Sequence, residues 1–168
     1  MRAPPLTPLA AAVLHVPAPE RALAIDCGEG EAVLFLAREF PAARVRGVDR
    51  SEASIRAATE RVGLDPEGRV AFKAGGPRRL PYPDGFFDLA VGTAGALNPS
   101  EAARVLRPGA HLIVAPARRP GIRGRLAFGL LRHRLRARGF SPLPLPDAEQ
   151  RNFLVARLGE PDWAAASI

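Results

Sequence analysis

The chain has 168 residues, 47% of them hydrophobic, which suits one buried core and is too short for two ordinary domains. We therefore expect a single domain over residues 1–168. The formal net charge is +7, but Lys73 is the only lysine and arginine supplies the rest, so basicity alone is weak evidence for a nucleic-acid or membrane partner. No apolar run is long enough to span a membrane. The only cysteine, Cys27, excludes a disulfide framework, so we expect a cytoplasmic protein.

The order of the expected elements predicts an α/β fold. Residues 1–20 contain several prolines and are expected to form a leading arm or a short helix rather than a cleaved signal. After them, strands are expected at residues 22–25, 44–48, 69–74, 87–92, 110–115 and 152–158, and helices at residues 31–40, 51–62, 100–106 and 122–138. Strands that alternate with helices indicate βαβ units, and hence a three-layer α/β/α sandwich around a mostly parallel, Rossmann-like sheet.

A glycine-rich loop joins the first expected strand to the first helix. It consists of Asp26, Cys27, Gly28, Glu29 and Gly30. Its glycines allow a tight turn and let a ligand approach the backbone closely. Asp49 ends the second strand nineteen positions after Gly30, about where a carboxylate accepts hydrogen bonds from the hydroxyls of a ribose. Together, the loop and Asp49 predict a site for an adenosine-type cofactor.

The residues around the loop favour one cofactor over another. A dinucleotide-binding loop needs a further glycine where this chain has Val33. Glu29 and Glu31 flank the start of the helix, where they would repel a diphosphate but suit the ammonium and sulfonium charges of S-adenosylmethionine. The pattern therefore favours S-adenosylmethionine, and a nicotinamide-dependent reductase is the weakest alternative.

Three segments carry a resemblance to a known family. Residues 22–51, 80–89 and 103–110 occur in an order and at spacings that resemble a class I S-adenosylmethionine-dependent methyltransferase, most closely the small-molecule branch related to the ubiquinone/menaquinone enzymes. The resemblance extends over nearly the whole chain. It implies S-adenosylmethionine as the cofactor, a small-molecule acceptor, a fifth helix closed by residues 138–140 and a final antiparallel strand at residues 152–157.

The sequence departs from the family pattern inside the cofactor motifs, which are therefore degenerate. Asp26 stands where the first loop glycine belongs, and Ala24 occupies the usual acidic position. Asp26 either supplies the missing carboxylate from a shifted position or leaves the contact to the ammonium group weaker. Gly76 replaces the acid that usually contacts adenine, and a short segment follows Val91 where relatives have residues that cover the substrate.

The resemblance implies roles for individual residues. Asp26 and the loop 27–30 would hold the methionine end of the cofactor, and Asp49 would bind the ribose. The adenine pocket would be lined by Arg50, Gly75 and Gly76, and Thr93 would lie under the methyl group. No general base is assigned, because methyl transfer needs alignment and desolvation more than a strong acid or base. The histidines show no ligand spacing, so no metal is expected.

Two other residues have structural interpretations. Asp88 stands at the start of the fourth expected strand and is interpreted as a structural acid. Cys27 is interpreted as a small residue in a tight loop rather than a nucleophile, since no histidine lies near it in the sequence.

Arginine is dense between Arg118 and Arg138. Among these arginines lie the aliphatic residues Ile122, Leu126, Leu130 and Leu131. We interpret the segment as a surface helix with one face on the sheet and the other solvated. The less favoured alternatives are contact with an anionic membrane or a nucleic acid, and a non-catalytic scaffold protein that uses this helix as its working surface. We also consider a homodimer or a partner subunit as the source of the missing substrate cover.

Overall fold

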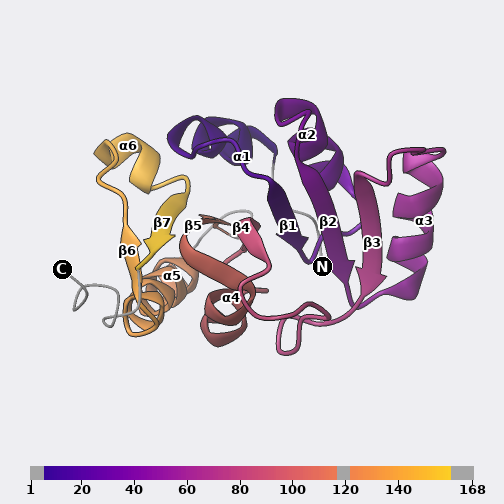
Figure 1. The fold of residues 1–168 in the computed structure, drawn as a ribbon. Coiled ribbons are helices and arrows are strands. Elements are labelled where there is room, and N and C mark those ends of the chain that lie inside the picture. Colours follow the sequence, from indigo (N-terminus) through magenta and orange to yellow (C-terminus); the bar gives the residue numbers. More distant parts are fainter. Residues whose placement is uncertain (1–5, 117–121, 160–168) are drawn as a thin grey trace.

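One seven-stranded sheet organises the molecule. The computed structural model describes residues 6–116 and 122–159, so Arg118 and Arg119 lie outside the described residues. The strands are β1 (Arg21–Ile25), β2 (Arg44–Asp49), β3 (Val70–Ala74), β4 (Phe87–Thr93), β5 (Leu106–Ala115), β6 (Phe140–Pro142) and β7 (Leu154–Leu158), in the spatial order β3-β2-β1-β4-β5-β7-β6 (Figure 1). Neighbours from β3 to β5 are parallel, and β7 is antiparallel to β5 and β6. The expected α/β fold and its final antiparallel strand are confirmed.

The helices lie around this sheet and make it the middle layer of the fold. They are α1 (Leu6–Ala12), the 3-10 helix η1 (Val13–His15), α2 (Glu31–Glu39), α3 (Glu52–Val62), α4 (Pro99–Val105), α5 (Ile122–Arg136) and α6 (Asp147–Gln150) (Figure 1). The side chain of Ser51 accepts a hydrogen bond from the backbone N–H of Ser54 and caps α3. Among the described residues, no helix has the length and hydropathy needed to cross a membrane.

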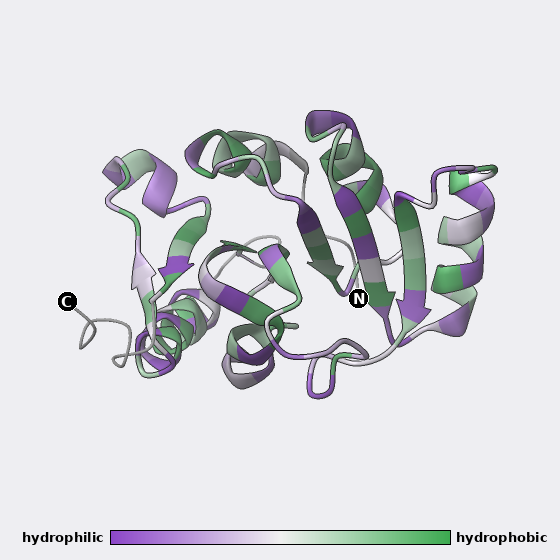
Figure 2. Ribbon diagram, in the orientation of Figure 1, coloured by the Kyte–Doolittle hydropathy of each residue, from purple (hydrophilic) through white to green (hydrophobic). Residues whose placement is uncertain are grey.

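Alternate residues of each central strand face two separate hydrophobic cores. Ala24 of β1 points into a core that contains Leu9 of α1 and Leu36 of α2. The adjacent Leu23 points to the other side, into a core that contains Leu135 of α5. This period of two places α1 and α2 on one face of the sheet and α5 on the other. Figure 2 shows that hydrophobic residues are concentrated where the helices and strands meet.

Two short elements near the end of the described chain were not predicted. The expected fifth helix ends at Arg136 rather than at residue 138, and β6 follows it. Phe140 of β6 pairs with Leu158 of β7 and is buried in the core. The burial of this one ring explains why the chain joins the sheet here. Elements as short as β6 and α6 carry no measurable hydrophobic period.

The strand β5 begins four residues earlier than expected. It starts at Leu106, directly after α4 ends at Val105, and Leu106 pairs with Phe87 of β4. The register of β4 and β5 shifts between Phe87 and Leu89. The expected start at residue 110 followed the helix-breaking pair Pro108 and Gly109, which the structure places inside the strand.

Asp88 anchors the start of β1 to β4. Its carboxylate accepts hydrogen bonds from the backbone N–H groups of Glu20 and Arg21 at 2.9 and 3.0 Å. The guanidinium group of Arg107 lies 3.1 Å from the same carboxylate. These contacts give Asp88 the structural role that we expected.

Gly47 in β2 lets an aromatic ring lie against the backbone. A Cβ atom at this position would lie 2.6 Å from Cδ1 of Phe72 and 2.9 Å from Sγ of Cys27. We expect Gly47→Ala to lower the free energy of unfolding by about 1–3 kcal/mol, because the ring and the loop must move apart. Urea unfolding measures the loss.

The control for this substitution is Gly129→Ala on α5. A Cβ atom at Gly129 meets no atom within 4 Å. Alanine there is expected to raise the free energy of unfolding by about 0.5–1 kcal/mol, because it lowers the entropy that the helix loses on folding. If the two variants unfolded at the same urea concentration, the packing argument for Gly47 would be wrong.

Candidate cofactor site

The loop of residues 26–30 is fixed to the end of β2 by its backbone. The N–H of Cys27 donates to the carbonyl of Val48 at 3.0 Å, and the N–H of Gly30 donates to the carbonyl of Cys27 at 3.0 Å. Gly30 has a φ of 86° and precedes the first residue of α2. A Cβ atom at Gly30 would lie 3.0 Å from Cζ of Phe72. The turn therefore needs glycine here both for its backbone angle and for space.

The carboxylate of Asp49 is buried beside this loop. Its side chain is 7% exposed. One oxygen accepts a hydrogen bond from the N–H of Gly28 at 2.9 Å, and the other accepts from the N–H of Ser51 at 2.8 Å. Each carboxylate oxygen can accept more than one hydrogen bond. Asp49 can therefore hold the loop and still accept hydrogen bonds from two further donors such as ribose hydroxyls.

Asp26 combines an unusual backbone angle with a buried charge. Its φ is 58°, and it is the only non-glycine residue with a positive φ in the part of the chain that the structure describes. Asp tolerates this left-handed conformation better than most residues, which suits a position where the resemblance expects glycine. The side chain is 5% exposed, and its Oδ2 atom has no hydrogen-bond partner among the described residues.

The surroundings of Asp26 disfavour its ionised form. Burial and the neighbouring Asp49 carboxylate raise the pKa of Asp26, while Arg50 acts in the opposite direction. A buried carboxylate oxygen without a donor is costly, and a bound cation with N–H groups would remove that cost. The chemistry of this position therefore fits an ammonium group.

The other polar residues in and beside the loop do not combine a buried charge with an unpartnered oxygen. Cys27 is fully buried. Its burial, together with the Asp49 carboxylate, raises the pKa of the thiol to about 12, so the nucleophilic thiolate is absent at neutral pH. Glu29 and Glu31 are exposed, and Glu31 lies 3.8 Å from Arg61 of α3. The charge of Glu31 is thus partly neutralised by Arg61 at the protein surface.

The residues expected around adenine lie together beside Asp49. The N–H of Gly75 donates to the backbone carbonyl of Asp49 at 2.9 Å. A Cβ atom at Gly76 would lie 3.3 Å from Cγ and Cδ of Arg50. The ends of β2 and β3 therefore bring Arg50, Gly75 and Gly76 into one place, and their role around adenine stays a prediction.

Thr93 ends β4 on the other side of β1. It is buried and pairs with Ala115 of β5. The preceding Gly92 lies beside Ile25, because a Cβ atom there would be 3.6 Å from the Cβ of Ile25. The carboxyl ends of β1 and β4 are thus adjacent, and each expected site residue lies at the carboxyl end of one of the strands β1 to β4. This is the edge where open α/β sheets bind ligands.

Comparison with known proteins gives the family. The model of the methyltransferase domain matches residues 22–109, more than half of the chain. The chain belongs to this methyltransferase family. It is 35% identical over 116 residues to a 27-O-demethylrifamycin SV methyltransferase of Amycolatopsis mediterranei, a match that covers 64% of this chain and 42% of that protein. A demethylmenaquinone methyltransferase of Lactiplantibacillus plantarum is 30% identical over 118 residues, which cover 65% of this chain and 50% of that protein.

The methyltransferase chain spans half or less of the length of these two relatives. Among solved structures, the [4+2]-cyclase SpnF is similar with a TM-score of 0.66 and 28% identity, over 88% of this chain and 61% of that chain. The resemblance drawn from residues 22–51, 80–89 and 103–110 is therefore confirmed. S-adenosylmethionine is the cofactor of this family, and the buried carboxylates of Asp26 and Asp49 suit its ammonium group and its ribose.

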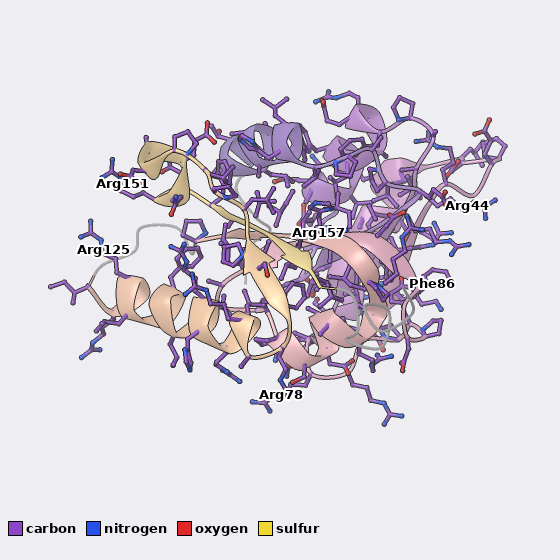
Figure 3. The ribbon with its side chains drawn as sticks, turned by 60° about the vertical axis from the view of Figure 1, so that its left-hand side comes forward. Arg44, Arg78, Phe86, Arg125, Arg151 and Arg157 are labelled. Atoms are coloured by element: carbon purple, nitrogen blue, oxygen red, sulfur yellow. The ribbon has the colours of Figure 1, made fainter. Side chains whose placement is uncertain are left out.

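A cavity at the same edge of the sheet was missed by the sequence analysis. It has a volume of about 580 Å³ and is lined by Pro116, Gly124, Arg125, Phe128, Gln150, Arg151 and Asn152. Pro116 directly follows β5, whose last residue pairs with Thr93. Figure 3 shows Arg125 at the start of α5 and Arg151 after α6 on the same flank of the molecule. No sequence signal could reveal this cavity, because three separate segments meet to form it.

Proposed function

We propose that this methyltransferase transfers the methyl group of S-adenosylmethionine to an apolar small molecule. The observation that carries the proposal is the pair of buried carboxylates at the glycine loop, one of them with an unpartnered oxygen. When bound, S-adenosylmethionine supplies a methyl group on a positively charged sulfur. The chain would supply binding and orientation: Asp49 would accept from the ribose hydroxyls, and Asp26 would accept from the ammonium group. Arg50, Gly75 and Gly76 would line the adenine pocket, and Thr93 would lie under the methyl group.

The cavity beside Pro116 is the proposed acceptor site. It combines the apolar surface of Phe128 with the charged groups of Arg125 and Arg151, which suits an apolar molecule that carries an anionic or strongly polar group. The names of the two relatives give their acceptors as 27-O-demethylrifamycin SV and demethylmenaquinone. The proposal assigns no general base for the proton that the acceptor loses; positioning and exclusion of water favour the displacement itself.

The proposal includes a second chain that covers the acceptor and a cytoplasmic location. Residues 94–98 alone separate β4 from α4, so a second copy or a partner subunit would complete the cover over the acceptor. The free thiol of Cys27 suits a reducing, cytoplasmic compartment.

A second candidate is a protein of the same fold that does not transfer methyl groups. SpnF, described as a [4+2]-cyclase, shows that a similar chain is named for other chemistry. Ala24 and Gly76 stand where the family usually has acids, and these changes motivate a binding or scaffold protein as well. Calorimetric titration with S-adenosylmethionine, S-adenosylhomocysteine and NAD separates the candidates.

We expect heat from the first two ligands and none from NAD. Silence with all three ligands at millimolar concentration would contradict the methyltransferase proposal and favour the scaffold. Mass spectrometry of candidate acceptors then shows whether a methyl group is transferred. If the protein binds S-adenosylmethionine but no acceptor gains a methyl group, the alternative without methyl transfer is favoured.

Asp26→Asn tests the proposed contact to the ammonium group. Because the raised pKa of Asp26 means that the folded state holds its proton more tightly, the ionised group costs stability at neutral pH, and this cost disappears as the pH falls. We expect the variant to gain about 1 kcal/mol in free energy of unfolding at neutral pH and to bind S-adenosylmethionine about tenfold more weakly. Urea unfolding and calorimetry measure the two effects.

The pH dependence gives an independent check on Asp26. In the wild type, affinity for S-adenosylmethionine should fall on acidification at a higher pH than an ordinary aspartate would give, and this step should be absent from Asp26→Asn. Unchanged affinity in the variant would show that Asp26 does not contact the cofactor.

A further inference from the structure

Helix α5 exposes a stripe of large aliphatic side chains. Ile122, Leu126 and Leu130 are spaced by four residues, so they lie on one face of the helix. They are 81%, 70% and 60% exposed, whereas Leu131 and Leu135 are buried against the sheet. The helix therefore packs one face on the sheet, as interpreted from the sequence, but its solvated side is partly apolar. The helix has two apolar faces, and one of them is uncovered among the described residues.

The surroundings of this stripe are strongly basic. Between Glu101 and Asp147 the sequence contains no acidic residue. The described part of this segment around α5 contains Arg123, Arg125, Arg132, Arg134, Arg136 and Arg138. None of the ion pairs among the described residues involves one of these arginines. The partner of this face should therefore offer negative charge and an apolar interior together.

We propose that α5 docks on an anionic lipid bilayer. Ile122, Leu126 and Leu130 enter the boundary between headgroups and acyl chains, and the flanking arginines bind the lipid phosphates. An anionic membrane surface attracts nearby basic residues, and its interior accepts aliphatic side chains. It is complementary to both properties of the helix.

Other partners match only one of these properties. A symmetric contact between two copies of α5 would place the arginines of one copy against those of the other, which is repulsive. A nucleic acid would satisfy the charge but offers little apolar surface to the stripe. Phe128 is the only phenylalanine, tyrosine or tryptophan of α5 and is half-buried, so the small imidazole of His133 is the one exposed ring that this helix offers for stacking on bases.

The stripe and the proposed acceptor site lie on different sides of α5. Gly124, Arg125 and Phe128 line the cavity beside Pro116, and the helical period places Gly124 and Phe128 roughly opposite Ile122, Leu126 and Leu130. The docking proposal therefore does not depend on the proposed function.

Vesicle flotation tests the docking. The wild type is mixed with vesicles of phosphatidylcholine and phosphatidylglycerol, or of phosphatidylcholine alone, at low and high salt. We expect binding to the anionic vesicles at low salt and at least about fivefold weaker binding to the neutral ones, since each basic residue near an anionic surface contributes about fivefold. Equal binding to both kinds of vesicle, or binding to neither, would overturn the proposal.

Two matched double variants separate the stripe from the overall charge of the protein. Leu126→Gln with Leu130→Gln leaves the charge unchanged and should weaken binding to anionic vesicles about tenfold or more. Leu14→Gln with Leu64→Gln makes the same change at two other exposed leucines and should change binding less than about twofold. If both double variants bound like the wild type, attraction would be non-specific and the proposal would be wrong.

A third double variant tests the arginines, and a duplex RNA tests the main rival. Arg123→Gln with Arg134→Gln should weaken vesicle binding by about fivefold for each residue. Calorimetry with S-adenosylmethionine should give the same affinity for the leucine variants as for the wild type, so a failed vesicle test and a failed cofactor test are distinguishable. Tight binding to duplex RNA that does not change in the Leu126→Gln, Leu130→Gln variant, without vesicle binding, would assign the helix to nucleic acid.

Discussion

Replacing Arg104 with alanine is expected to lower the free energy of unfolding by about 2–4 kcal/mol. The guanidinium group donates hydrogen bonds to the backbone carbonyls of Leu80 and Tyr82 at 3.0 and 2.8 Å. It also pairs at 2.8 Å with Glu101 and with Asp84. Arg104 therefore joins α4 to the segment that leads into β4. Without it, the carbonyl of Tyr82 loses its side-chain donor and the carbonyl of Leu80 keeps only the N–H of Tyr82. The partly buried Glu101 loses its cationic partner and keeps only the N–H of Leu80. Urea unfolding measures the change.

Two further variants define what Arg104 contributes. Arg104→Lys keeps the charge but cannot reproduce the planar fork of donors, so an intermediate loss is expected. Arg56→Ala removes the same side chain from the exposed surface of α3 and should cost less than about 0.5 kcal/mol. If Arg104→Ala were as stable as Arg56→Ala, the hydrogen bonds of Arg104 would be replaced by water without cost.

The effect of Arg104 also depends on pH. The hydrogen bond from Arg104 holds the pKa of Glu101 below its ordinary value of 4.5, and the backbone N–H of Leu80 acts in the same direction. A carboxyl group whose pKa is lowered by folding stabilises the folded state at every pH above its ordinary pKa. This contribution is lost as the pH falls through the lower pKa of the folded state. The difference in stability between wild type and Arg104→Ala should therefore narrow at acid pH. A constant difference down to the acid limit would assign the loss to the backbone carbonyls alone.

The sequence predicted the parts of the fold that depend on local pattern. The strand expected at residues 22–25, the helix expected at residues 31–40 and the glycine loop between them all depend on residues close together in the chain, and the structure has each of them. Helix α5 shows where this approach ends. It has leucines on two faces, and only the packing of distant strands determines that Leu131 faces the sheet while Leu126 faces outward.

The same distinction applies to the cofactor site. The placement of Asp26 in the family motif was readable from the spacing to Asp49. The sequence could not predict that an oxygen of Asp26 lacks a hydrogen-bond donor, because this depends on burial by segments far apart in the chain. The cavity beside Pro116 was unpredictable for a similar reason, since its lining comes from the end of β5, the start of α5 and the end of α6.

The carboxylate of Asp49 has one structural role that the hydrogen bonds show and one proposed role toward the cofactor. It accepts from the backbone N–H groups of Gly28 and Ser51, and this fixes the glycine loop against the start of α3. Each carboxylate oxygen can accept more than one hydrogen bond, so the same group is also available for the proposed contact with the ribose. A loss of affinity on mutation could therefore come from a displaced loop or from lost ribose contacts.

Asp49→Asn is expected to weaken binding of S-adenosylhomocysteine at least about 100-fold, because two hydrogen bonds to a charged acceptor are lost or weakened. An analogue of the ligand without the two ribose hydroxyls separates the two roles in a double-mutant cycle. If Asp49 acts on the ribose, the analogue binds weakly to the wild type and the substitution weakens it little further. If the substitution weakened both ligands by the same factor in calorimetry, Asp49 would act only through the loop, and the ribose would have to be held by another group. Asp49 also holds the loop in the ligand-free protein. Urea unfolding of the ligand-free variant therefore measures how much stability the protein loses when these loop contacts are changed.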